Sequence, residues 1–282
     1  MKIIVHGGAW AIPDNAVEDH LKGVTQAVKK GLKEKNALDA VEKAINTMEN
    51  DPTFDAGYGS FLNANGEIEL DAIIAENSNF GAVAGVSKVR NPISLAKKIL
   101  RDNEVNFIIC RGAEDYAEKN GVPLCDPKEL IMERELKRWR RIKKENKKPE
   151  DFFHSTVGAV ALDENGNIAA GTSTGGTPNK IPGRVGDSPL FGAGCYANSS
   201  VGISATGYGE CIMRVLLSRT VAELYKKMEL EQACKEALTV LKNIGGYGGV
   251  ISIDVKGNFG YSFNTPRMAY AFNEGNKINS FI

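Results

Sequence analysis

Thr156 stands where a charged, polar stretch changes abruptly into an apolar one. Residues 143–155 are poor in aliphatic side chains, whereas Val157–Leu162 reads as a buried strand. If the peptide bond before Thr156 were cut, this residue would carry both a hydroxyl nucleophile and a free α-amine. Such an amine has a pKa of about 7.7–8.0 and could serve as the base near neutral pH. The alternative is that Thr156 is only a β-branched residue that opens a strand.

Arg184 and Asp187 form a second candidate group for binding chemistry. They lie three residues apart in a loop bounded by glycines and prolines, 182–189, so both side chains can face one pocket. A guanidinium can bind a carboxylate through two hydrogen bonds, and a carboxylate can hold an ammonium. Together they could bind the two charged ends of a free α-amino acid. The alternative is a local Arg–Asp ion pair that braces a turn.

Two further threonines lie in glycine-rich loops next to predicted strands. The Thr206-Gly207 pair precedes a helix that we expect to begin near Glu210, and a hydroxyl plus a backbone N–H there could stabilise an oxyanion. The same spacing is also typical of a helix N-terminal capping box, and the two interpretations are compatible. Thr174, within 171–176, could hydrogen-bond the nucleophile or merely end a strand.

The elements that must position these residues follow from hydrophobic periodicity and turn signals. In the first half we expect a strand at Lys2–His6 that stops at Gly7-Gly8, and a glycine-punctuated strand region over 57–89. Helices are expected at 16–34, 37–49, 92–100, 113–120 and 126–148, with a strand at 107–110. In the second half we expect strands at 157–162, 168–173, 201–205, 249–255 and 259–263, and helices at 210–228 and 231–244. The strands and the helices occur in groups rather than in strict alternation, which favours an α+β fold. The hairpins, one of which turns at Asn165-Gly166, favour an antiparallel sheet.

Composition excludes several classes of function. Lys+Arg and Asp+Glu both number 35, so there is no overall basic bias toward nucleic acid, and the basic run 137–144 reads as a solvated helix face. No apolar run approaches the roughly 18–20 residues of a membrane helix. The five cysteines lack a C-x-x-C pair, and the three histidines lack metal-ligand spacing, which argues against zinc and disulfides. We therefore expect a cytoplasmic protein with no membrane, nucleic-acid or catalytic-metal partner.

At these motifs the sequence resembles the plant-type L-asparaginases and isoaspartyl peptidases, which are N-terminal nucleophile hydrolases. The similar segments span nearly the whole chain and include His6–Ala9, Asp55–Gly57, Gly81–Val86, Thr156–Asp163, Gly171–Gly176, Gly183–Pro189, Thr206–Glu210 and Gly248-Gly249. The resemblance implies one domain over 1–282 with a four-layer αββα sandwich. It also implies self-cleavage between Ser155 and Thr156, into an α chain (1–155) and a β chain (156–282), and a homodimer of such αβ units.

The resemblance also implies roles at matching positions. Thr156 would be the nucleophile, and Thr174 would orient and activate it. Arg184 would bind the α-carboxylate of asparagine or of a β-aspartyl dipeptide, and Asp187 its α-ammonium. The oxyanion hole and remaining substrate contacts would come from Thr206, Gly207 and Gly209. No cofactor is implied apart from a structural sodium ion, held by backbone carbonyls in Glu49–Gly59.

The chain departs from the family pattern at three informative places. Ser155 stands where glycine is usual, so we expect the strain and rate of self-cleavage to be affected. Asp55 replaces a common asparagine and would add an anion near the site. Trp10 replaces glycine, and we expect it to narrow the substrate entrance. Because His154-Ser155-Thr156 is similar to the His-Asp-Thr of glycosylasparaginases, such an amidase is one alternative; an unprocessed amino-acid-binding protein is another.

Overall fold

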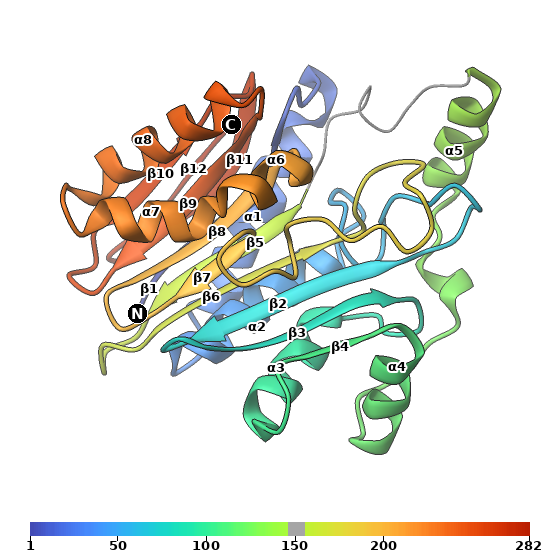
Figure 1. Ribbon diagram of the computed structural model, residues 1–282, viewed down its shortest axis with the longest axis horizontal. Helices are drawn as coiled ribbons and strands as arrows, with labels where there is room; N and C mark the ends of the chain where they lie inside the picture. Colours follow the sequence, from blue (N-terminus) through green and yellow to red (C-terminus); the bar gives the residue numbers. More distant parts are fainter. Residues whose placement is uncertain (146–155) are drawn as a thin grey trace.

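The computed structural model describes residues 1–145 and 156–282 and shows two β-sheets stacked between two helical layers (Figure 1). The larger sheet has eight strands in the order β12-β11-β1-β5-β6-β2-β3-β4, and the smaller has four in the order β10-β9-β8-β7. The larger comprises β12 (Lys277–Phe281), β11 (Arg267–Glu274), β1 (Lys2–Trp10), β5 (Val157–Leu162), β6 (Ile168–Thr174), β2 (Leu70–Glu76), β3 (Asn79–Val86) and β4 (Phe107–Ile109). The smaller comprises β10 (Phe259–Phe263), β9 (Gly248–Asp254), β8 (Val201–Gly207) and β7 (Cys195–Ala197). Neighbouring strands are antiparallel except for the parallel pair β3 and β4.

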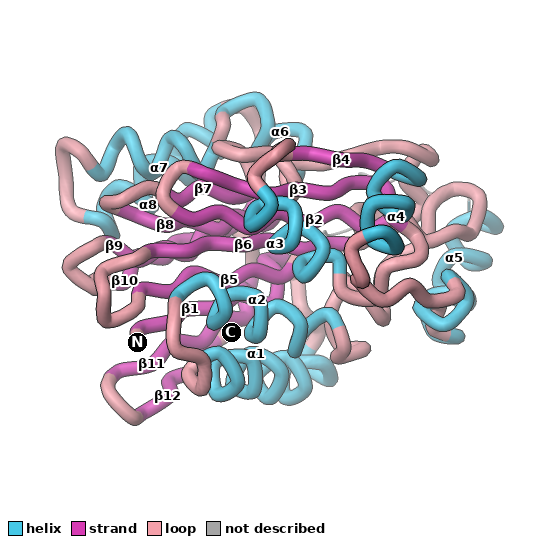
Figure 2. The backbone as a smooth tube through the Cα atoms, turned by 90° about the horizontal axis from the view of Figure 1, so that it is seen from below, coloured by secondary structure: helices cyan, strands magenta, loops and turns pink. Residues whose placement is uncertain are grey.

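Helices cover the outer face of each sheet, as Figure 2 shows for the larger one. The larger sheet is covered by α1 (Val17–Gly31), α2 (Ala37–Glu49) and α3 (Pro92–Asp102), and the smaller by α7 (Leu217–Tyr225) and α8 (Leu230–Asn243), with α6 (Gly209–Val215) beside them. Along the chain, β4 is followed by α4 (Cys110–Lys119) and α5 (Glu133–Glu145); short 3-10 turns occupy Asp14–Ala16 and Pro127–Leu130. Three separate buried clusters fill the spaces between the four layers. The predicted four-layer α+β sandwich is confirmed.

Strand β5 shows how the sequence assigns its side chains to the two layers of core. Val157, Ala159 and Ala161 belong to the cluster beneath the helices, whereas Val160 belongs to the cluster between the sheets. Successive side chains of a strand point to opposite faces, so this alternation follows directly from the pleat. Gly158 therefore faces the inter-sheet layer, and the same period directs Thr156 toward that side.

Several predicted boundaries were wrong. The first strand does not stop at Gly7-Gly8 but continues to Trp10. Its pairing with β11 is irregular between His6 and Ala9, and this irregularity accommodates the two glycines within the strand. The helix expected over 210–228 is two helices, α6 and α7, separated at Leu216, whose φ is +47°. The helix expected over 126–148 is a short 3-10 turn followed by α5, and residues 146–148 lie outside the described residues.

Three strands escaped the sequence analysis. β7 has only three residues, and β12 is largely exposed, so neither shows a clear hydrophobic period. β11 pairs with β1 and extends the large sheet beyond the hairpin that we expected to close the chain. In the described part of the chain, every helix is too short or too polar to cross a membrane.

Candidate active site

The hairpin of β5 and β6 brings the two strand-end threonines together. Val157 pairs with Ser173, so Thr156 comes opposite Thr174 at the open end of the hairpin. The Thr156 hydroxyl donates to the Thr174 hydroxyl over 3.2 Å, and both residues are buried. The backbone N–H of Gly176 donates to the same Thr174 oxygen at 3.0 Å, which holds that side chain in place. A strand-opening threonine is thus paired with a second hydroxyl, as an oriented nucleophile requires.

Thr206 and Gly207 reach the same place from the other sheet, at the end of β8. The predicted capping box is wrong, because Thr206 lies inside β8 and the residue that precedes α6 is Tyr208, which makes no side-chain cap. The Thr206 hydroxyl is buried and has no hydrogen-bond partner among the described residues. Buried polar groups are almost always paired, so an unpaired hydroxyl indicates a group kept for a ligand or a reaction. Gly207 has φ +141°, and a Cβ there would stand 2.3 Å from the Tyr247 carbonyl oxygen.

Arg184 and Asp187 both line the small cavity that contains Thr156 and Thr174. Their side chains converge at Gly209, where a Cβ would stand 2.8 Å from the Arg184 Nη2 and 2.8 Å from the Asp187 Oδ1. The ion pair that the structure records for Arg184 is with Glu210, at 2.8 Å, and not with Asp187. This geometry disfavours the turn-bracing alternative and leaves both charged groups directed at one space.

Asp187 is buried without a full set of partners. Its Oδ2 has no hydrogen-bond partner in the described part of the chain. Burial raises the pKa of Asp187 to about 7, although the neighbouring Arg184 opposes the shift. An ammonium group brought beside this carboxylate would favour its ionised form, so the site is well suited to a cationic ligand.

His6 is a functional candidate that the sequence analysis did not single out. Its Nδ1 donates to the Thr156 carbonyl oxygen at 3.1 Å, and its Nε2 lies 3.0 Å from the Ser204 hydroxyl. The Ser204 hydroxyl in turn lies 2.8 Å from the Thr172 hydroxyl. Burial lowers the pKa of His6 to about 3 despite the bond to Thr156, so the ring is neutral at ordinary pH. The signal in the sequence was a histidine inside an apolar strand, but only the stacked sheets reveal its partner.

Asp55 lies close to the paired threonines and is buried. Its carbonyl oxygen accepts from the Gly175 N–H at 3.1 Å, and its Oδ1 accepts from the Phe61 N–H at 2.9 Å. Burial raises the pKa of Asp55 well above its usual value, and the hydrogen bond from the Phe61 N–H opposes this shift. The added anion near the site stays a prediction.

The loop Glu49–Gly59, in which the resemblance implies sodium, contains backbone carbonyl oxygens that lie close together. A Cβ at Gly59 would stand 2.9 Å and 3.0 Å from the carbonyl oxygens of Pro52 and Phe54, so these two oxygens converge beside a residue with no side chain. Backbone carbonyls are the donors that hard cations prefer. The Pro52 oxygen also accepts from the Arg134 guanidinium, so it is not free for a metal ion, and sodium binding stays a prediction.

The cavity around Thr156 is nearly closed. Its volume is about 10 Å³, at the lower limit for one water molecule and too small for an amino acid. A ligand would therefore have to separate groups that now touch, such as Arg184 and Glu210. Ser155, the other half of the predicted cleavage site, lies outside the described residues.

A four-layer sandwich with a threonine at the head of an inner strand defines the class of N-terminal nucleophile hydrolases. Residues 1–282 match the family model described as asparaginase, and the chain belongs to this family. It is 40% identical to an isoaspartyl peptidase/L-asparaginase of Xenopus laevis over 95% of this chain and 91% of that protein. It is also 40% identical to a plant-type L-asparaginase of Pyrococcus abyssi, over 96% and 95% of the two chains. An isoaspartyl peptidase/L-asparaginase of Bos taurus is 39% identical over 99% of this chain and 95% of that protein.

Proposed function

We propose that this chain is a self-processed threonine hydrolase that cleaves the β-amide of L-asparagine and the isopeptide bond of β-aspartyl dipeptides. The observation that carries the proposal is the 3.2 Å contact between the hydroxyls of Thr156 and Thr174, in a cavity that Arg184 and Asp187 also line. The names of the family relatives support both substrates. The proposed roles of individual residues follow from this geometry.

The chemistry would proceed through an acyl-enzyme. The Thr156 hydroxyl attacks the β-carbonyl carbon of the substrate, and the free α-amine of the same residue takes the hydroxyl proton. The carbonyl oxygen becomes an oxyanion, which the unpaired Thr206 hydroxyl and the Gly207 N–H would stabilise. The proton passes to the leaving nitrogen, and ammonia or an amino acid departs. Water then hydrolyses the ester and releases aspartate.

Substrate recognition would depend on the aspartyl half alone. Arg184 would exchange its Glu210 partner for the substrate α-carboxylate, and Asp187 would bind the α-ammonium, with Gly209 leaving room between them. Neither group contacts the nitrogen that leaves. The same site could therefore accept asparagine, which releases ammonia, and an isoaspartyl dipeptide, which releases an amino acid.

Maturation is the step that distinguishes this proposal from an unprocessed binding protein. The α-amine exists only after cleavage between Ser155 and Thr156, into chains 1–155 and 156–282. Intact-mass measurement of the purified protein should show these two fragments in every active preparation. Thr156→Ala should leave one full-length species without activity, whereas Thr156→Ser, which keeps a hydroxyl, should still be processed. A fully active but uncut chain would overturn the proposal.

Substrate choice is tested by a direct comparison of hydrolysis rates. Asparagine, β-aspartyl-leucine and a GlcNAc-asparagine should be assayed with the same matured sample. Turnover of the first two supports the proposal, whereas preferential turnover of the glycosylated compound would favour a glycosylasparaginase-like amidase.

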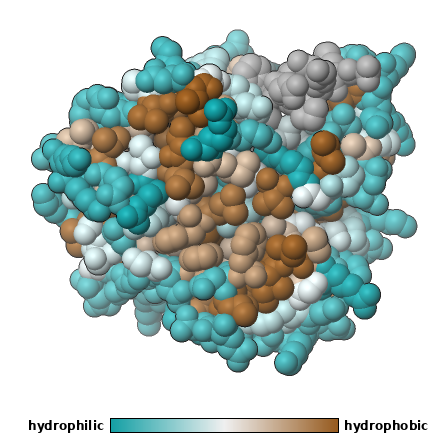
Figure 3. All heavy atoms as spheres, in the orientation of Figure 1, coloured by the Kyte–Doolittle hydropathy of each residue, from teal (hydrophilic) through white to brown (hydrophobic). Residues whose placement is uncertain are grey.

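We further propose a cytoplasmic homodimer of αβ units. Val105, Phe107, Ile109 and Leu124 are exposed apolar side chains around the edge strand β4. Figure 3 shows apolar residues gathered over this part of the molecule, framed by polar ones. Exposed apolar patches on sheet edges are typical of subunit contacts. Light scattering of the matured protein should give twice the mass of one αβ unit, and Ile109→Lys should reduce it to that of one unit.

A further inference from the structure

A separate cavity of about 310 Å³ lies between the end of β1, the start of α1 and helix α5. Trp10, His20, Asp55, Phe61, Arg134 and Arg138 are among the residues that line it. Its volume falls at the lower end of the range of about 300–1,000 Å³ that is typical of small-molecule sites. It therefore has room for a group the size of one amino-acid residue.

Three residues that line this cavity each carry a buried polar atom without a hydrogen-bond partner among the described residues: Trp10 Nε1, His20 Nε2 and Asp55 Oδ2. Trp10 Nε1 can only donate. His20 Nδ1 donates to the Ala16 carbonyl at 2.8 Å, so Nε2 of the neutral ring is an acceptor. Orphaned polar atoms are rare in folded proteins, and three around one cavity indicate that something polar belongs there.

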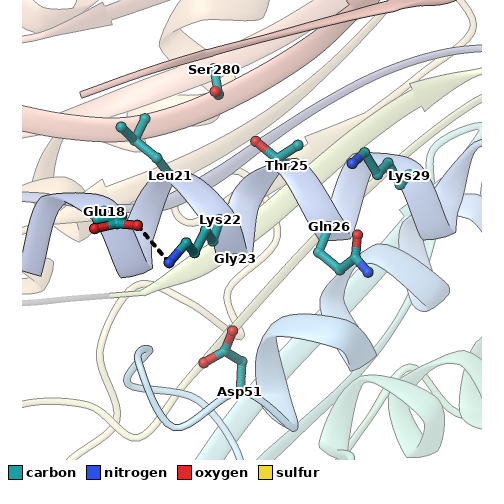
Figure 4. Close-up of a pocket in the computed structure, with 9 residues that line it drawn as sticks. All are labelled: Glu18, Leu21, Lys22, Gly23, Thr25, Gln26, Lys29, Asp51 and Ser280. Atoms are coloured by element: carbon teal, nitrogen blue, oxygen red, sulfur yellow. Dashed lines mark ion pairs between the residues drawn. The ribbon is translucent and has the colours of Figure 1, made fainter.

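A surface hollow along α1 provides a contrast (Figure 4). It is larger, about 540 Å³, but charged helix side chains such as Glu18, Lys22 and Lys29 line it, and two of these already form an ion pair at 2.7 Å. None of the residues that line it carries a buried unpaired polar atom. Size alone therefore does not select the site.

The cavity adjoins the catalytic threonines through Asp55. Asp55 forms part of its wall, and the Oδ1 of the same residue lies 2.5 Å from the position that a Cβ on Gly175 would occupy. Gly175 directly follows Thr174, whose hydroxyl accepts from Thr156. Asp55 and the Gly175-Thr174 pair thus lie between the cavity and the proposed nucleophile.

We propose that this cavity receives the leaving residue of a β-aspartyl dipeptide, preferentially one with an apolar side chain. The inference rests on the proposed function and names the part of the substrate that Arg184 and Asp187 do not touch. The rings of Trp10 and Phe61 supply apolar walls, and Trp10 Nε1 supplies a donor for a carbonyl or carboxylate oxygen.

The leaving residue of a dipeptide also carries a free α-carboxylate, and α5 offers it a cation. Arg134 and Arg138 both line the cavity and both donate to the buried carboxylate of Glu135, and Arg134 also donates to the Pro52 carbonyl oxygen. Asp19 also lines the cavity but is exposed, where water screens its charge. The Arg138 guanidinium lies over the Phe61 ring at 4.9 Å, so a positive charge is adjacent to an apolar surface. This arrangement matches the carboxylate and the apolar side chain of an apolar amino acid.

The test compares substrates with and without a leaving residue. The measured quantity is kcat/KM for β-aspartyl-phenylalanine divided by kcat/KM for asparagine, using protein whose cleavage has been verified by mass. Arg138→Gln should lower this ratio about tenfold, mainly through KM, because a charge-assisted hydrogen bond is lost. For β-aspartyl-phenylalanine amide, which lacks the carboxylate, the same variant should leave the corresponding ratio at the wild-type value. Arg141→Gln, on the exposed side of the same helix, is the matched control and should not change either ratio.

Trp10→Phe is a second variant, which keeps an aromatic ring but removes the pyrrole part of the indole together with its N–H. This variant should lower the dipeptide-to-asparagine ratio of kcat/KM at least threefold. It tests the proposal independently if Arg138→Gln fails to mature. Wild-type ratios in Trp10→Phe and in any matured Arg138→Gln protein would show that the cavity holds only water, and would overturn the inference. If the wild-type protein hydrolyses neither substrate, the proposed function itself fails, which is a different result.

Discussion

The pH dependence of catalysis offers the sharpest check on the proposed role of Asp187. Burial raises the pKa of this carboxyl to about 7 in the empty site. If the ionised form binds the substrate α-ammonium, lowering the pH through 7 must weaken binding. With a pKa of about 7, the ionised fraction falls from about 0.9 at pH 8 to about 0.09 at pH 6, which is a tenfold loss.

The bound state should behave differently. Once the ammonium lies beside Asp187, the opposite charge favours the carboxylate and lowers its pKa. The rate at saturating asparagine, kcat, then reports chiefly the α-amine of Thr156, whose ordinary pKa is about 7.7–8.0. The rate at low asparagine, kcat/KM, reports that amine and also Asp187 in the free enzyme. Between pH 8 and pH 6, kcat/KM should therefore fall about tenfold more than kcat.

Steady-state kinetics with asparagine at six or seven pH values would measure this difference. Succinamate, which has the same amide and carboxylate but no α-ammonium, is the matched control substrate. For succinamate the two parameters should fall in parallel, since Asp187 has no cation to bind. Parallel curves with asparagine, or the same tenfold gap with succinamate, would refute the assignment of Asp187 to the ammonium.

Three further substitutions test the geometry of the site. Gly209→Ala places a Cβ 2.8 Å from Arg184 Nη2, and should raise KM for asparagine about tenfold in a protein whose melting temperature is little changed. Glu210→Gln removes the charged partner that competes with the substrate for Arg184. It should lower KM for asparagine by no more than about fivefold, as expected for a partly exposed ion pair. A raised KM would show that Glu210 positions the guanidinium instead. Gly158→Ala places a Cβ 2.3 Å from His6 Nε2, and should cost about 1–3 kcal/mol of stability and slow self-cleavage, as thermal melts and mass spectra would show.

The second helix illustrates how well local signals can locate an element. Residues 37–49 were predicted from apolar spacing, and α2 has the same bounds, with Asn36 capping its start through the Asp39 N–H. The break at Leu216 and the extension of β1 through Gly7-Gly8 were not predictable in this way. The extension of β1 depends on packing, because the glycine at position 7 leaves room for the Phe54 ring, which a Cβ there would meet at 2.4 Å. A sequence pattern records which residues are apolar, but not which distant side chain occupies the space beside them.

The same distinction between local sequence signals and long-range packing applies to the candidate site. The sequence by itself determined the chemical groups: a threonine at the head of a strand, a guanidinium and a carboxylate in one loop, and a threonine–glycine pair before a helix. The motifs and the turn at Asn165-Gly166 also predicted the hairpin that pairs Thr156 with Thr174, because that contact is local. Only the tertiary structure decided that His6 holds the Thr156 carbonyl, that Glu210 occupies Arg184, and that Asp55 is buried. Those features depend on contacts between residues far apart in the chain, such as His6 on β1 and Thr156 at the head of the neighbouring strand of the large sheet, and on the burial that folding produces.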